Sequence, residues 1–206
     1  MAFVWRTGRA MGRQLHEAKA MLFGRHTLMC AEVVRGGRPR LVAAPGAAEA
    51  LAEARGAGLR VGICDGQPAV GARAGVVMSP ASARVQVDWM LGPFDVWQGC
   101  PHEPADRCCA PTPRLLLEAA RGMGVSGHDL VVISDTGSDM GAAQGAGAVG
   151  ILVPTARTLR AEIAHVPLVA PDLISAVRGV LGTDQRWLIE CSPTHRSLRS
   201  PVPEPA

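Results

Sequence analysis

The stretch VVISDTGSDMGAAQGAGAVGILVPT, Val131–Thr155, predicts a strand, a helix and a second strand in direct succession. The first strand begins at Asp129 as DLVVISD, and such a continuous apolar run is typical of a strand buried on both faces of a parallel sheet. Asp135 ends this strand, and Asp139 follows four residues later, in the first turn of the helix. This spacing directs two carboxylates to one spot at the sheet edge, as a hard cation such as Mg²⁺ requires. An Asp139 that only caps the helix or complements its dipole is the other interpretation.

The rest of the chain from residue 20 repeats this alternation of strand and helix. Strands are predicted at 20–23, 61–64, 94–100, 129–135 and 149–154, and helices at 45–60, within 73–91, and at 113–125, 138–148 and 171–182. This order predicts an α/β domain in which helices cover a mostly parallel sheet, a three-layer Rossmann-like fold. Ligands of such folds bind at the carboxyl ends of the strands.

The composition favours one globular domain with an aliphatic core. Of the 206 residues, 48% are hydrophobic, 19% are charged and 3% are aromatic. Four basic residues against one acid give residues 1–19 a charge of +3, which equals the net charge of the whole chain. The remainder is therefore neutral, which argues against a nucleic-acid surface, because such a surface needs clustered lysine and arginine. We expect a basic N-terminal extension at 1–19, a domain at 20–182 and a flexible C-terminal tail at 183–206.

Membrane and secretion signals are missing from the sequence pattern. No apolar run approaches the roughly 18 residues of a membrane span. The N-terminal segment lacks the apolar stretch and the cleavage site of a secretion signal. These features predict a cytoplasmic protein without membrane contact, whose six cysteines are thiols or metal ligands rather than disulfides.

The loop CPHEPADRCCAPTP, Cys100–Pro113, carries a candidate zinc site. Cys100 and His102 lie two residues apart, and Cys108 and Cys109 follow. Three thiolates and one imidazole are the ligand set of a structural tetrahedral zinc ion, and a long loop without apolar content needs such a crosslink. Surface thiols that bind no metal are the alternative, because adjacent cysteines are awkward ligands for one ion.

Two of these stretches resemble a known family. The segment Val131–Thr155 resembles the fourth motif of the haloacid dehalogenase (HAD) superfamily, the Mg²⁺-dependent phosphohydrolases with an aspartate nucleophile. The loop Cys100–Pro113 resembles the zinc loop of subfamily IIIA, the D,D-heptose 1,7-bisphosphate and histidinol-phosphate phosphatases, although the family's last zinc ligand aligns with Ala110. The likeness extends from about Ala20 to Gly182 and includes GPFDVWQGCPH and GILVPT. It implies the HAD fold with a minimal cap and a zinc-loop insertion.

The same resemblance predicts that the nucleophile is missing. In the family, the first strand leads into Asp-x-Asp-Gly-Thr-Leu, where the first aspartate attacks phosphorus and the second transfers protons. In MLFGRHTLMC, Met21–Cys30, this alignment places Gly24 at the nucleophile position and His26 at the acid/base position, and the glycine before Thr27 is missing. Glycine has no side chain that could attack, whereas histidine can still transfer a proton.

The second and third motifs also depart from the family pattern. The second, usually Thr-Asn-Gln, reads Asp65-Gly66-Gln67, so a carboxylate stands where a phosphate-binding hydroxyl is expected and would repel a phosphate dianion. The third needs a lysine or arginine, but the only lysine of the chain, Lys19, precedes the first strand. Arg107 or Arg114 could supply part of this charge. The candidate ligand-binding residues are Gln67, Thr27 and Arg114.

Three functional hypotheses follow. The first is a pseudophosphatase that retains the fold, has lost hydrolysis, and binds a partner protein or a small phosphorylated or sugar-like ligand. The second is a repurposed enzyme with a new metal or acid-base site at the strand ends, formed by Asp65, Asp135, Asp139 and His26. The third is a divergent sugar-phosphate phosphatase of the heptose bisphosphate type, which requires a nucleophile that the sequence does not provide. We favour the first, with His26, Asp65 and Asp135 as the remaining catalytic candidates and with Asp135 and Asp139 as ligands of any magnesium ion.

Overall fold

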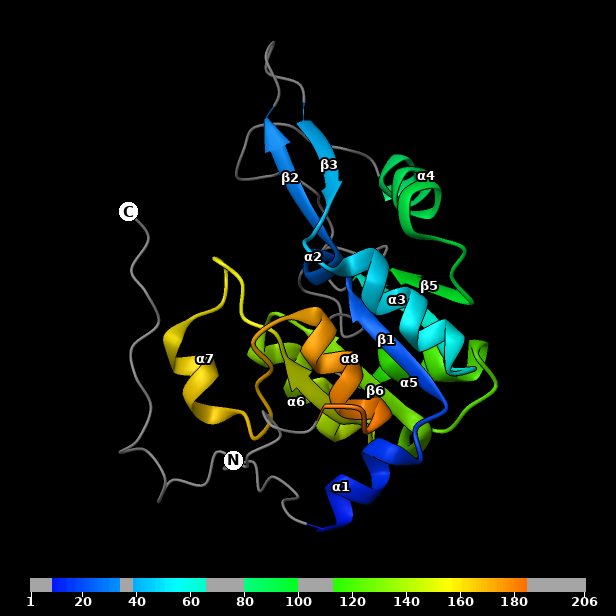
Figure 1. The fold of residues 1–206 in the computed structure, drawn as a ribbon, viewed down its shortest axis with the longest axis vertical. Coiled ribbons are helices and arrows are strands. Elements are labelled where there is room, and N and C mark those ends of the chain that lie inside the picture. Colours follow the sequence, from blue (N-terminus) through cyan, green and yellow to red (C-terminus); the bar gives the residue numbers. More distant parts are fainter. Residues whose placement is uncertain (1–8, 34–38, 66–79, 100–112, 185–206) are drawn as a thin grey trace.

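The computed structural model of the chain describes residues 9–33, 39–65, 80–99 and 113–184 (Figure 1). Gln67, Arg107 and the four predicted zinc ligands lie outside these residues. Within the described ranges, one sheet has five strands in the order β5-β4-β1-β6-β7. These strands are β1 (Ala20–Gly24), β4 (Arg60–Asp65), β5 (Val96–Gly99), β6 (Leu130–Ser134) and β7 (Val149–Leu152).

Every neighbouring pair in this sheet is parallel, which confirms the predicted α/β class. The central strands β1 and β6 are buried along their whole length. Side chains of β1 alternate between the two faces of the sheet: Met21 and Phe23 belong to one apolar cluster, and Ala20 and Leu22 belong to the other. Because both faces are buried, these strands are continuous apolar runs rather than alternating ones.

Helices pack on both faces of the sheet, which gives the predicted three layers. On the face that contains Phe23 lie α3 (Ala47–Gly56), α4 (Pro80–Leu91) and α8 (Leu173–Leu181), and on the face that contains Leu22 lie α5 (Arg114–Gly122) and α6 (Gly137–Gly145). The predicted helix at 45–60 is shorter than expected because Gly58, with φ of 79°, turns the chain into β4. No helix in the described ranges is both long and apolar enough to cross a membrane.

A short helix and a hairpin, which the sequence pattern does not predict, follow β1 directly. The helix is α2 (Arg25–Leu28), and the antiparallel hairpin consists of β2 (Met29–Val33) and β3 (Pro39–Ala43). Figure 1 shows the hairpin extending beyond the end of β1, next to α4. The chain reverses between β2 and β3, and α2, which follows Gly24 directly, lies at the carboxyl edge of the sheet.

Two more helices lie at the periphery, α1 (Arg9–His16) and α7 (Arg160–His165). α1 falls inside the predicted extension 1–19, but it packs against α8. Leu15 of this helix is 2% exposed, and the side chain of Gln14 donates to the backbone oxygens of His128 and Gly147. Part of the basic segment is thus attached to the domain by specific contacts.

Candidate functional site

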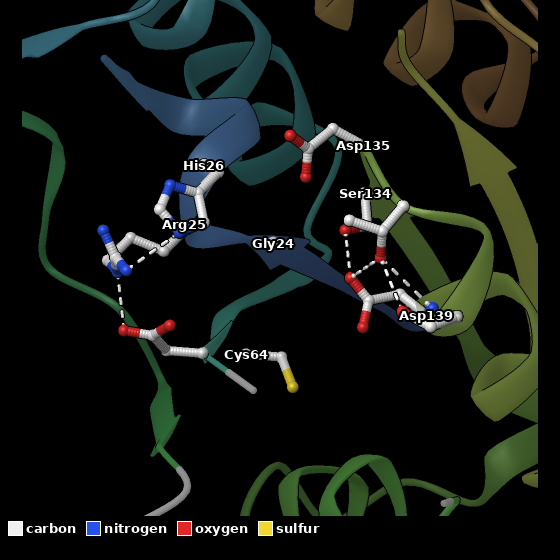
Figure 2. A pocket seen from close by; sticks show the side chains of 10 residues that line it. Gly24, Arg25, His26, Cys64, Ser134, Asp135 and Asp139 are labelled. Carbon is white, nitrogen blue, oxygen red and sulfur yellow. Dashed lines mark hydrogen bonds and ion pairs between the residues drawn. The ribbon is translucent and has the colours of Figure 1, made fainter. Parts of the chain in front are cut away.

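A cavity of about 90 Å³ opens at the carboxyl ends of β1, β4 and β6 (Figure 2). It is lined by the ends of these strands, by α2 and by the first turn of α6. The lining residues are Gly24, Arg25, His26, Cys64, Asp65, Ser134, Asp135, Thr136, Ser138 and Asp139. The structure therefore brings together all four ionisable residues that the sequence places at these strand ends, Asp65, Asp135, Asp139 and His26.

Gly24, at the predicted nucleophile position, lies against Ser134. The register of β1 and β6 pairs Phe23 with Ile133, so the next residue of each strand lies at the same level. A Cβ atom on residue 24 would lie 2.5 Å from Ser134 Oγ and 3.1 Å from Ser134 Cβ. The first separation is too short for non-bonded heavy atoms and the second is a tight contact, so a side chain at position 24 requires the Ser134 side chain to move. The space that a nucleophile would need is occupied by a hydroxyl group.

Arg25, the first residue of α2, forms a buried ion pair with Asp65. The Arg25 side chain is 1% exposed and that of Asp65 is 11% exposed. Arg25 Nε donates to Asp65 Oδ2 at 2.5 Å, and Arg25 Nη2 lies 3.0 Å from His26 Nε2. The carboxylate at position 65 is therefore neutralised from within the protein. Sequence reasoning missed Arg25, although an acid at the end of a buried strand signals that a cation must lie nearby.

The imidazole of His26 is neutral at neutral pH. Its pKa is lowered from 6.5 to about 3, first because burial disfavours the cation, and then because Arg25 and Arg157 repel it. Arg157 lies in the loop between β7 and α7 and does not line the cavity. A neutral imidazole has no imidazolium proton to give, which argues against the general-acid part of the role predicted for His26.

Asp135 follows β6 directly and is 2% exposed. Thr155 Oγ1 donates to its Oδ2 at 2.9 Å, and Thr158 Oγ1 donates to its backbone oxygen at 2.7 Å. Both threonines lie in the loop after β7, so this loop fixes the position of the Asp135 carboxylate.

Asp139 lies in the first turn of α6, but it is not the cap of that helix. Thr136 is the N-cap residue, and its hydroxyl accepts from the backbone amide of Asp139. Asp139 Oδ2 accepts from Ser134 Oγ at 2.5 Å and from Thr136 Oγ1 at 2.8 Å. Burial raises the pKa of Asp139, these two hydrogen bonds oppose the rise, and the charges of Asp135 and Asp65 add to it. The carboxylate lines the cavity, and the interpretation of Asp139 as the helix cap is wrong, although its place in the first turn also suits the helix dipole.

Two other candidate residues, Thr27 and Arg114, lie outside the cavity. Thr27 is buried and does not line the cavity, because its hydroxyl donates to the backbone oxygen of Gly24. Arg114 is exposed at the start of α5, where it pairs with Glu118 at 2.8 Å. Cys64 lines the cavity, but burial and two neighbouring carboxylates raise the pKa of its thiol. A protonated thiol is a poor nucleophile.

The residues of the cavity fit a magnesium ion only in part. Among the described residues, the side-chain hydrogen bonds to the carboxylates of Asp135 and Asp139 reach Oδ2, so these residues leave one oxygen of each carboxylate to a cation. Mg²⁺ can bind to two carboxylates with water in its other positions. Gly24 supplies no third ligand, however, and Asp65 is paired with Arg25. Among the described residues, no group of three or more His, Cys, Asp or Glu side chains is arranged to hold a metal ion.

Comparison with known proteins agrees with this architecture. A family model described as HAD-hydrolase-like matches residues 107–177. This match and the parallel sheet make the chain similar to proteins of the HAD superfamily. It is also similar to a D,D-heptose 1,7-bisphosphate phosphatase. The enzyme from B. bronchiseptica, whose structure contains magnesium and phosphate, is 25% identical, with a TM-score of 0.63 over 81% of this chain and 99% of that chain.

Two other solved structures share the fold at lower sequence identity. The 3-deoxy-D-manno-octulosonate 8-phosphate phosphatase of Moraxella catarrhalis is 12% identical, with a TM-score of 0.58 over 86% of this chain and 94% of that chain. A hypothetical protein from Xanthomonas campestris is 12% identical, with a TM-score of 0.59 over 90% and 96% of the two chains. No curated protein sequence matches the chain.

Proposed function

We propose that this chain is a HAD phosphatase homologue that has lost aspartyl-phosphate chemistry and acts as a pseudophosphatase, binding a ligand or a partner protein. The observation that carries the proposal is the packing of Ser134 against Gly24. An empty nucleophile position could reflect one recent substitution. Here, in addition, the side chain of Ser134 overlaps the place that a Cβ atom at position 24 would take, so restoring an aspartate also requires Ser134 to move.

The environments of His26 and Asp65 support the same proposal against the two enzyme hypotheses. A repurposed acid-base site needs groups that exchange protons near neutral pH. His26, whose pKa is about 3, does not meet this requirement, and the Asp65 carboxylate is held by Arg25. A divergent phosphatase needs a nucleophile, and neither Gly24 nor the protonated thiol of Cys64 provides one.

We expect no phosphatase turnover from the purified protein. With p-nitrophenyl phosphate and Mg²⁺, release of p-nitrophenol should equal that of the buffer, because losing a covalent nucleophile costs roughly a million-fold in rate. The matched control is Asp135→Asn, which should give the same background. An active HAD phosphatase assayed in parallel verifies the conditions. Turnover that disappears in Asp135→Asn would show that the site is catalytic and would overturn the proposal.

We also propose a structural zinc ion bound by Cys100, His102, Cys108 and Cys109, on the chemistry of this donor set. Elemental analysis should find about one zinc ion per chain, and Cys100→Ser should lower this content. Cys30→Ser is the matched control, because Cys30 is an exposed cysteine on β2, outside the loop. Zinc content near zero in the wild type, or equal content in the two variants, contradicts this assignment.

A further inference from the structure

We propose that the exposed face of α4 (Pro80–Leu91) binds the same face of a second copy of this chain, with the two helices antiparallel about a two-fold axis. The inference goes beyond the proposed function and does not depend on it, because none of the described residues that line the cavity belongs to α4. Two large apolar side chains on this helix, and the order of the charges beside them, carry the proposal.

Helix α4 has one buried face and one exposed face. Ala83, Val87 and Leu91 are at most 4% exposed and belong to the apolar cluster on the Phe23 face of the sheet. On the other side of the helix, Val85 is 68% exposed and Trp89 is 86% exposed. Figure 1 shows α4 at the outer edge of the molecule, beside the hairpin.

Val85 and Trp89 form one apolar surface rather than two isolated contacts with water. Residues four apart on a helix lie next to each other on the same side. Single exposed apolar residues are ordinary on a protein surface, whereas adjoining ones mark a site of interaction. Tryptophan is also among the residues that contribute most to binding at protein interfaces. The exposed face of α4 therefore fits a protein partner.

The shape of this face suits a second copy of itself. Ala81 and Ser82 continue the exposed face towards the N-terminus of α4, so the face is small at one end and bulky at the other, where Trp89 lies. A two-fold axis at the level of Gln86 places Trp89 of each copy opposite Ala81 and Ser82 of the other copy. Large side chains then pack against small ones, as close helix packing requires.

The charges beside this face are arranged for an antiparallel copy. Arg84 and Asp88 lie one turn apart on the same flank, where Arg84 Nε is 3.6 Å from Asp88 Oδ2. The guanidinium of Arg84 also lies 6.0 Å from the centre of the Trp97 ring. Within one helix, a base that precedes an acid is the less favourable order, because the helix dipole favours acids towards the N-terminus.

The antiparallel arrangement turns this order into an attraction. The two-fold axis at Gln86 brings Arg84 of each copy to the level of Asp88 of the other copy, and same-side flanks meet across such an axis. Two charge pairs of opposite sign therefore join the copies, and the dipoles of the two helices also attract. A parallel pair would instead place Arg84 against Arg84, so the charges favour the antiparallel pair.

Sedimentation equilibrium of the full chain over a wide range of protein concentration tests the proposal. One helix face is smaller than the roughly 800 Å² per partner of a standard interface, so we expect a reversible dimer in the micromolar range. Trp89→Ala should raise its dissociation constant at least about 30-fold. Leu159→Ala is the matched control, because Leu159 is 65% exposed but lies at the start of α7, and it should leave the dissociation constant unchanged.

A charge exchange tests the antiparallel arrangement. Arg84→Asp places aspartates opposite each other at both pairs and should weaken the dimer about tenfold or more. Arg84→Asp/Asp88→Arg restores opposite charges between the copies and should recover most of the wild-type affinity. Both variants lose the contact with Trp97, so that loss cannot account for a difference between them. Urea denaturation at a concentration where the wild type is monomeric verifies that each variant is folded.

A wild type that stays monomeric at every concentration overturns the proposal, and so does a dimer that Trp89→Ala leaves unchanged. A charge exchange that recovers no affinity contradicts the antiparallel arrangement. Turnover of a phosphate ester overturns the proposed function alone, so the two failures are distinguishable.

Discussion

Arg25→Met is expected to destabilise the protein by about 3–5 kcal/mol, because it removes the buried cation that pairs with the Asp65 carboxylate in a nearly buried site. Asp65→Leu should cost a similar amount, since it leaves the Arg25 guanidinium, 1% exposed, without a counterion. The free energy of unfolding from urea denaturation, monitored by circular dichroism, measures both. Such a loss is a large part of the total stability of a domain of this size.

The double variant Arg25→Met/Asp65→Leu completes a double-mutant cycle with the wild type and the two single variants. With both charges removed, no uncompensated ion remains, so we expect the double variant to be far more stable than either single variant and within about 1–2 kcal/mol of the wild type. Lys19→Met is the control, because Lys19 pairs with Asp129 at 2.9 Å but its side chain is 68% exposed. That change should cost less than about 1 kcal/mol. Single variants at Arg25 and Asp65 that behave like Lys19→Met would contradict the buried pair.

The sequence predicts the sheet and most of its helices because the signals are local and strong. DLVVISD is a long apolar run between polar boundaries, and PDLISAVRGVLG carries its apolar residues at helical spacing. The sequence does not predict α2 or the hairpin β2–β3, because these elements are short and their positions depend on contacts with the end of β1 and with α4. Tertiary packing decides such short segments, and local propensity does not.

Only part of the site could be predicted from the sequence, because some of its contacts join residues that are far apart in the chain. Asp135 and Asp139 could be placed because their spacing fixes them relative to one strand and one helix. Ser134 was missed because its relation to Gly24 depends on the register between two strands that are more than 100 residues apart in the chain. The predicted proton transfer by His26 took the residue type into account but not its burial beside Arg25, which lowers its pKa. Contacts across strands and the hydration of side chains are not local properties of a sequence.

Gly24→Asp, the change that restores the family's nucleophile, is expected to destabilise the protein by about 1–3 kcal/mol or more and not to restore it as an enzyme. The new Cβ would lie 2.5 Å from Ser134 Oγ, so the two strands or the Ser134 side chain must shift. Adding Ser134→Gly in the same chain removes the obstructing hydroxyl. The double variant should therefore recover most of the lost stability, as measured by urea denaturation of the four members of the cycle.

Gly12→Asp is the control for introducing an aspartate at a glycine. A Cβ on Gly12 meets no atom within 4 Å, so this change should alter the free energy of unfolding by less than about 0.5 kcal/mol.

The double variant Gly24→Asp/Ser134→Gly also places a third carboxylate beside Asp135 and Asp139. We expect it to bind Mg²⁺ more tightly than the wild type in calorimetry, since a hard cation gains an oxygen ligand. If Gly24→Asp alone is as stable as Gly12→Asp, Ser134 moves aside freely. In that case the space at the nucleophile position is available, and the loss of the aspartate is a single reversible substitution rather than an adaptation of the site.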